Sequence, residues 1–185
     1  ILIDTSLSMS QKLSELDSTT AFEWAREDIV ERLKDGADDR RFHLLSFNQE
    51  VEQHFPEWVQ DRVSLSAELS NIVKTEKAGK TVIGLQAARR LFDGQGGEIW
   101  LYTDQSGHST SGIEDEIELL VRQNVSLIPK EIPIQSPSNL VITQANYTTG
   151  LEGGTLQFTV QNFGQRTVEA RCMVTLPDGT EINTF

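Results

Sequence analysis

Two hydrophobic patterns alternate along the first 130 residues of this 185-residue chain. Short apolar runs predict strands at residues 1–4, 41–47, 51–55, 98–104 and 125–128. Between them, apolar residues recur at intervals of three and four and predict helices at residues 20–35, 63–73, 82–92 and 113–121. Alternating strands and helices predict an α/β domain with a doubly wound, mostly parallel, Rossmann-like sheet. Residues 51–55 follow the preceding strand closely, which predicts one antiparallel edge strand.

The pattern changes at Pro129, after which no helical period is left. Residues 131–138 contain two prolines and predict an extended linker. Apolar runs at residues 140–142, 156–160 and 168–176 predict short strands. We therefore expect an α/β domain at 1–130, a linker at 131–138 and an incomplete β-sandwich at 139–185. Because Ile1 falls within a predicted buried strand, we expect that strand to start before residue 1 in a longer protein.

Composition and charge narrow the classes of function. The formal net charge of −12 opposes nucleic-acid binding, which depends on Lys and Arg neutralising phosphates. The single cysteine, Cys172, excludes an internal disulfide and a cysteine-based zinc site, and we expect it to be a buried, inert thiol. No apolar run approaches the ~20 residues of a membrane-spanning helix. The densest acidic run, residues 114–118, is typical of a solvated helix face near an N-terminus.

Oxygen-bearing side chains follow the first predicted strand at regular spacing. Asp4, Ser6 and Ser8 form an Asp-x-Ser-x-Ser loop, Thr81 stands at the entrance of a helix, and Asp104 ends another strand. In an open α/β sheet, ligands bind outside the carboxyl ends of the strands, and Mg²⁺ prefers oxygen donors. Taken from these residues alone, the pattern leaves two interpretations open, a metal site and an ordinary capped loop.

In this order, the five residues resemble the metal-ion-dependent adhesion site of von Willebrand factor type A domains, and the resemblance covers residues 1 to about 130. It implies that the Ser6 and Ser8 hydroxyls bind Mg²⁺ directly, with Mn²⁺ as a substitute. It also implies that Asp4 and Asp104 act mostly through metal-bound water, and that Thr81 acts directly or through water. Two positions depart from the family: Leu7 and Gln105 stand where glycine is common.

The resemblance also implies a non-enzymatic, metal-dependent protein-interaction module whose partner supplies an acidic residue to the metal. Residues 158–164 resemble the immunoglobulin-like β-domains of bacterial surface and membrane proteins. The combination is similar to the aerotolerance-associated group of bacterial proteins. It implies membrane anchoring through segments outside this chain, on an undetermined side of the membrane. Relatives in that group are linked with MoxR-type ATPases, so such an ATPase is the partner class implied here.

Two alternatives remain beside the interaction module. One is a Mg²⁺-dependent phosphoester hydrolase with Asp4 as nucleophile or metal ligand, although Ser6 stands where a second acid would serve as general acid. The other is a structural scaffold with a vestigial metal site. Residues 79–81 imitate the end of a phosphate-binding loop, but Lys74 replaces its first glycine. Of the histidines, we expect His43 to be packed, His54 to be exposed and His108 to be a polar loop residue.

Overall fold

The computed structural model describes residues 1–14, 18–35, 39–104, 112–134, 140–150, 153–162, 172–175 and 181–184. The chain divides into two compact units, Ile1–Gln135 and Ser136–Phe185, and each is described here by itself. Among the described residues, no helix has both the length and the apolar character needed to cross a membrane.

The first unit is built on a five-stranded sheet in the order β3-β2-β1-β4-β5. Its strands are β1 (Leu2–Asp4), β2 (Leu45–Phe47), β3 (Val51–Gln53), β4 (Gly97–Tyr102) and β5 (Val125–Lys130). β1 pairs in parallel with β2 and β4, and β4 pairs in parallel with β5. β3 is antiparallel to β2 and forms one edge. The mostly parallel sheet with one antiparallel edge strand confirms the predicted fold class.

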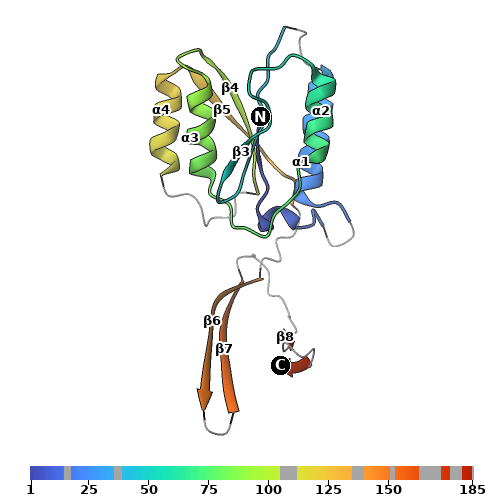
Figure 1. The fold of residues 1–185 in the computed structure, drawn as a ribbon, viewed down its shortest axis with the longest axis vertical. Helices are drawn as coiled ribbons and strands as arrows, with labels where there is room; N and C mark the ends of the chain where they lie inside the picture. The colour runs from blue at the N-terminus through green and yellow to red at the C-terminus, as the bar shows by residue number, and fades with distance from the viewer. Residues whose placement is uncertain are drawn as a thin grey trace. The chain divides into compact units, whose positions relative to one another are not determined.

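Helices cover both faces of this sheet (Figure 1). α1 (Ala21–Asp35) and α2 (Arg62–Asn71) lie on one side, and α3 (Thr81–Leu91) and α4 (Ile113–Arg122) lie on the other. Because side chains alternate along each strand, neighbouring strand residues enter different cores. Ile3 and Tyr102 pack with α1 and α2, whereas Leu2 and Leu101 pack with α3 and α4. Packing on both faces therefore extends to the last residues of β1 and β4, at the carboxyl edge of the sheet.

Short-range signals set the helix ends. At the start of α1, the Thr20 backbone N–H donates to Glu23 Oε2 at 2.7 Å, and the Glu23 N–H donates to Thr20 Oγ1 at 3.3 Å, a reciprocal capping box. At the start of α2, Asp61 accepts the Val63 N–H at 3.0 Å. Between β1 and α1, Leu7–Ser10 form the 3₁₀-helix η1.

The strand predicted at residues 41–47 is shorter in the structure, where β2 covers Leu45–Phe47. Phe42 forms an isolated bridge with Val59 instead.

The expectation of an exposed His54 is wrong. Its side chain is only 5% exposed, with Nδ1 3.2 Å from Glu68 Oε1 on α2 and Nε2 2.9 Å from Ser46 Oγ on β2. Two polar partners from separate elements satisfy the ring, so a residue at the end of an edge strand is enclosed. His43 is buried, as expected.

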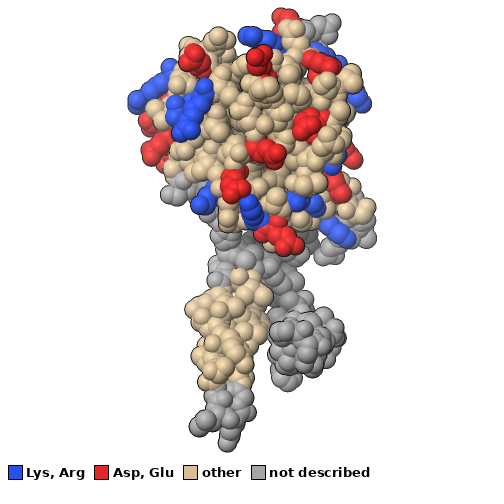
Figure 2. Space-filling model, in the orientation of Figure 1, with Lys and Arg blue, Asp and Glu red and all other residues tan. Residues whose placement is uncertain are grey.

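The acidic run on α4 is not uniformly solvated. Glu116 is 4% exposed and forms an ion pair with Arg89 of α3. Val121, which belongs to the predicted apolar pattern of this helix, is 66% exposed, whereas Leu120 is fully buried. Figure 2 shows acidic and basic side chains interspersed over the displayed face of the first unit. No large field of one sign covers that face.

The second unit contains two antiparallel strand pairs. β6 (Leu140–Gly150) pairs with β7 (Gly153–Asn162), and β8 (Cys172–Thr175) pairs with β9 (Glu181–Thr184). The first pair extends well beyond the two short apolar runs that predict it. The immunoglobulin-like sandwich stays a prediction, and the Cys172 side chain lies outside the described residues.

Candidate metal centre

Two neighbouring strands bring Asp4 and Thr103 together at the carboxyl edge of the sheet. Asp4 ends β1, and Thr103 follows β4, whose Tyr102 pairs with Ile3 in parallel register. Thr103 Oγ1 donates a hydrogen bond to Asp4 Oδ2 at 2.9 Å. Asp104, the next residue, is half-buried. The register therefore places the two predicted aspartates at the ends of adjacent strands.

The Asp-x-Ser-x-Ser loop folds back on its own carboxylate. The Ser6 backbone N–H donates to Asp4 Oδ1 at 2.8 Å, and Ser6 Oγ lies 3.0 Å from Ser8 Oγ. Asp4 is 3% exposed and Ser6 is 1% exposed. The spacing therefore brings a carboxylate and two hydroxyls into one small cluster of oxygen atoms.

The loop before α3 packs against this cluster through Gly79. A β-carbon at position 79 would stand 3.1 Å from both Asp4 Oδ2 and Ser6 Oγ, so only glycine permits the approach without displacing its neighbours. Backbone hydrogen bonds hold the two loops together: Leu7 N–H donates to Lys77 O at 3.0 Å, and Thr75 N–H donates to Thr5 O at 2.8 Å.

Thr81, 5% exposed, begins α3 two residues after Gly79. The entrance of α3 therefore lies beside the first loop. The sequence shows the glycine, but nothing in it indicates how closely the backbone approaches Asp4.

Asn48 links three segments around the site and was not predicted. Its Nδ2 donates to Thr5 Oγ1 at 3.2 Å, and its backbone carbonyl accepts the Lys80 N–H at 2.9 Å. Thr5 Oγ1 in turn donates to Phe47 O at 3.1 Å. The turn between β2 and β3 thus fixes both the first loop and the residue before Thr81. An asparagine in a turn gives no sequence signal for this role, because turns commonly contain asparagine.

The electrostatics of the cluster favour a cation. Burial raises the pKa of Asp4, and the charge of Asp104 raises it further, while hydrogen bonds from Ser6 and Thr103 oppose the rise. A divalent cation beside both carboxylates would offset the cost of burying the Asp4 charge and the repulsion between Asp4 and Asp104. Buried hydroxyl and carboxylate oxygens fit Mg²⁺, which takes oxygen ligands and keeps several waters. Among the described residues, no group of three or more His, Cys, Asp or Glu side chains is arranged to hold a metal, so these hydroxyls are essential to any site here.

Of the two positions that depart from the family pattern, Leu7 and Gln105, the structure describes only Leu7. Leu7 opens η1, and the described non-glycine residues with positive φ are Asp93 and Asn124 alone, so its backbone needs no glycine. Its side chain is 55% exposed beside the serines. Gln105 lies outside the described residues, as does His108.

Comparison with known sequences identifies the fold family. A sequence model of the von Willebrand factor type A domain matches residues 1–108, more than half of the chain. The chain belongs to this family. Von Willebrand factor type A domains are generally non-enzymatic adhesion or interaction modules. No curated protein sequence matches the chain.

Solved structures similar to this chain include a bacterial protein and a mussel protein. An aerotolerance-related membrane protein from Bacteroides fragilis, solved with multiple mutations to serine, is 16% identical with a TM-score of 0.62, covering 87% of this chain and 79% of that chain. Proximal thread matrix protein 1 from the mussel byssus is 18% identical with a TM-score of 0.52, covering 69% of this chain and 34% of that chain. At these identities the likeness concerns the fold alone.

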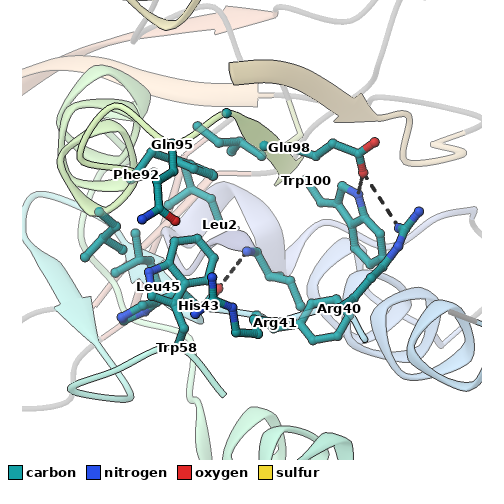
Figure 3. Close-up of a pocket in the computed structure, with 17 residues that line it drawn as sticks. Leu2, Arg40, Arg41, His43, Leu45, Trp58, Phe92, Gln95, Glu98 and Trp100 are labelled. Carbon is teal, nitrogen blue, oxygen red and sulfur yellow. Dashed lines mark hydrogen bonds and ion pairs between the residues drawn. The ribbon is translucent and has the colours of Figure 1, made fainter. Parts of the chain in front are cut away.

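A pocket of about 420 Å³ lies at the starts of β1 and β4, away from the oxygen cluster at the ends of these strands. Figure 3 shows the residues that line it. Its walls include His43, Trp58 and Phe92, and the Trp58 ring meets the other two edge to face. Trp100 Nε1 donates to Glu98 Oε2 at 3.4 Å. β4 begins at Gly97, but β1 pairs only with its last two residues, so the pocket occupies the place beside the first part of β4. Arg40, Arg41 and Glu98 line it beside the apolar side chains, and none of the predicted metal ligands does.

Proposed function

We propose that this von Willebrand factor type A domain is a non-enzymatic, Mg²⁺-dependent protein-interaction module. Its predicted ligands are Asp4, Ser6, Ser8, Thr81 and Asp104. The observation that carries the proposal is the approach of Gly79 to Asp4 and Ser6, which brings the entrance of α3 against the oxygen-rich loop. Mn²⁺ would substitute for Mg²⁺, because both take octahedral oxygen ligands.

The donor set supports binding of a partner carboxylate. The Ser6 and Ser8 hydroxyls are neutral, and two of the five predicted ligands, Asp4 and Asp104, are carboxylates. A metal held by so few charges stays electrophilic and attracts an external anion. An acidic side chain of a partner protein is the ligand that this chemistry favours, and the metal would supply an attachment point whose strength depends on that ligand's charge.

The geometry of Asp4 favours binding over hydrolysis. Both carboxylate oxygens accept hydrogen bonds, Oδ1 from the Ser6 N–H and Oδ2 from Thr103 Oγ1, and the residue is 3% exposed. A nucleophilic carboxylate must reach the reacting atom of a substrate, whereas a ligand of metal-bound water needs only the second lone pair of an oxygen that already accepts one hydrogen bond. No specific observation supports the hydrolase or the scaffold.

The partner and the location extend the proposal beyond the site. The neighbour from Bacteroides fragilis is an aerotolerance-related membrane protein, and we place this chain in a similar bacterial, membrane-associated setting. Any anchor would be supplied by segments outside the described residues. The partner class is the MoxR-type ATPase implied by the sequence resemblance, with an acidic residue presented to the metal.

Calorimetric titration with Mg²⁺ and Mn²⁺ tests the proposal. The parent chain is compared with Asp104→Asn, which removes one carboxylate charge at nearly constant size, and with Asp115→Asn, an equivalent change at an exposed position of α4. We expect one binding event in the parent, a loss of affinity of at least about tenfold in Asp104→Asn, and no change in Asp115→Asn. Absence of binding in a chain that melts cooperatively would overturn the proposal.

A further inference from the structure

The pocket beside the first part of β4 has the form of a gap in the sheet. β1 pairs with β4 only at Leu101 and Tyr102, so the stretch Gly97–Trp100 of β4 has no partner on that side among the described residues. On its other side, β4 pairs with β5 along its whole length. The pocket of about 420 Å³ therefore lies where a longer β1 would run.

Backbone groups of β4 face this gap. The Gly97 N–H donates to Asn124 O at 3.1 Å, on the side of β5. Because backbone N–H and C=O groups point to alternate sides of a strand from one residue to the next, those of Glu98 and Trp100 point toward the gap. Donors and acceptors along an open strand edge favour pairing with another strand.

The facing wall presents backbone groups as well. The Phe42 N–H donates to Val59 O at 2.7 Å and its carbonyl accepts the Val59 N–H at 2.9 Å, so the backbone groups of Phe42 point away from the gap. Those of His43 point toward it, and its carbonyl accepts a hydrogen bond from the Ile1 amine at 2.7 Å. The Leu45 N–H donates to Ile1 O at 3.0 Å. The ladder between β1 and β2 thus continues to Ile1, at the mouth of the gap.

The side chains around the gap suit a buried strand. Trp58 lies on one side of it and Trp100 on the other (Figure 3). Of the charged residues that line it, Arg40 and Glu98 pair with each other, with Nη1 3.8 Å from Oε2, and Arg41 is exposed. Aromatic walls and two rows of backbone groups together match an extended chain with apolar side chains.

We propose that the gap is filled by the segment of the same protein that immediately precedes Ile1, which runs as an extension of β1 between β4 and residues 41–43. Leu2 pairs with Leu101 on one side and with Leu45 on the other. Continued backward, this register places the residue before Ile1 between Ile99 and His43. Three residues, about 10 Å of extended chain, span the gap.

The environment of Ile1 favours a segment that is continuous with the chain over a separate peptide. Burial lowers the pKa of the Ile1 amine to about 5. A peptide N–H at the same place would donate the same hydrogen bond to His43 O without a charge to desolvate. A separate peptide would end against this amine, whereas a continuous strand removes it.

The two faces of the sheet predict which residue types the segment carries. Side chains alternate along a strand, so the residue before Ile1 shares the side of Leu2, whose core includes Phe92. The second residue before Ile1 shares the side of Ile1 and Ile3, where Trp100 packs. Both positions should therefore be apolar. A charged residue at either of them would contradict the proposal.

Lengthening the chain tests the proposal. The parent is compared with a chain that carries the four natural residues preceding Ile1, and with a control lengthened by Gly-Ser-Gly-Ser, which has the same length but no apolar side chains. We expect the natural extension to raise the melting temperature by at least about 5 °C, because it buries apolar side chains in the gap. The control should melt close to the parent.

Hydrogen exchange shows whether the added residues pair with β4. The backbone amides of Glu98 and Trp100 should exchange at least about a hundredfold more slowly in the naturally lengthened chain than in the parent. The Ile99 amide, which points toward β5, is the internal reference and should change far less.

Either measurement can overturn the proposal. Equal melting temperatures for the natural extension and the Gly-Ser control would show that no side chains enter the gap. Unchanged exchange of the Glu98 and Trp100 amides would show that the gap stays open beside β4, as for a pocket that takes a small apolar molecule or a strand from another protein.

Discussion

Gly79 lies so close to Asp4 that a β-carbon at position 79 would stand 3.1 Å from the carboxylate oxygen Oδ2. The same carbon would stand 3.1 Å from Ser6 Oγ, and both neighbours are held by other hydrogen bonds. Gly79→Ala should therefore displace the oxygen cluster by a few tenths of an ångström. We expect Mg²⁺ affinity, measured by calorimetry, to fall roughly tenfold, as for other changes that disturb the support of a ligand.

Ala78→Gly is the control for this substitution. It alters the same loop by one exposed methyl group and adds no atom near Asp4. Its Mg²⁺ affinity should stay within about twofold of the parent, since the change acts mainly on the unfolded chain. Equal affinities of the parent and Gly79→Ala would show that the close approach does not matter for the metal.

Asp4→Asn should stabilise the metal-free domain and abolish its response to metal. The amide avoids the burial of a charge and the repulsion from Asp104, the causes that raise the pKa of Asp4. In chelator, the variant's melting temperature should exceed the parent's by about 2 °C or more. In millimolar Mg²⁺ only the parent should gain stability, because ligand binding stabilises the native state alone. A variant that still gains stability with Mg²⁺ would remove Asp4 from the site.

The ion pair between Arg89 and Glu116 joins α3 to α4, and Glu116 is 4% exposed. Arg89→Met leaves a buried carboxylate without its partner, so we expect a loss of about 3 kcal/mol in the free energy of unfolding. The double variant Arg89→Met/Glu116→Gln should recover a large part of this lost free energy, because the amide leaves no buried charge without a partner. Denaturant unfolding of both variants and of Glu116→Gln completes the cycle, and simple additivity would contradict this account.

The capping box of α1 predicts a pH-dependent stability. Hydrogen bonds from the Thr20 backbone and hydroxyl lower the pKa of Glu23 from its ordinary value of 4.5. Because the folded-state pKa lies below the unfolded one, ionised Glu23 stabilises the fold above pH 4.5, and this is lost as the pH falls through the folded-state value.

Glu23→Ala should therefore cost about 1 kcal/mol in the free energy of unfolding near neutral pH and much less in acid. Denaturant unfolding across this pH range measures the difference. Glu27→Ala, at an exposed position of the same helix, should show little change at either pH. A Glu23→Ala effect that does not vary with pH would assign the cap to the Thr20 side chain alone.

Local signals explain why the sequence predicted most of the fold. The capping box joins Thr20 and Glu23, three residues apart, and apolar runs followed by turn residues indicated each strand of the sheet. The predicted ligands Asp4, Ser6 and Ser8 lie within five residues, so their clustering follows from one short loop. The assignment of these residues to a metal remains a prediction.

Long-range contacts explain what the sequence did not predict. Glu116 is buried because Arg89 reaches it from another helix, and His54 is enclosed because Ser46 and Glu68 approach it from two other elements. The approach of Gly79 to Asp4 joins loops that are far apart in the chain. Such contacts depend on how the elements pack, and no local pattern of residue types records them.

The most direct test of the metal centre is anomalous diffraction from crystals soaked in Mn²⁺. The account predicts a single strong peak on the domain, about 2.1 Å from the hydroxyl oxygens of Ser6 and Ser8 and beside Asp4 and Asp104. Crystals of Asp104→Asn should show a weaker peak or none. A peak at another place, or none beside Ser6 and Ser8 at millimolar Mn²⁺, would contradict a metal-dependent interaction at this edge of the sheet.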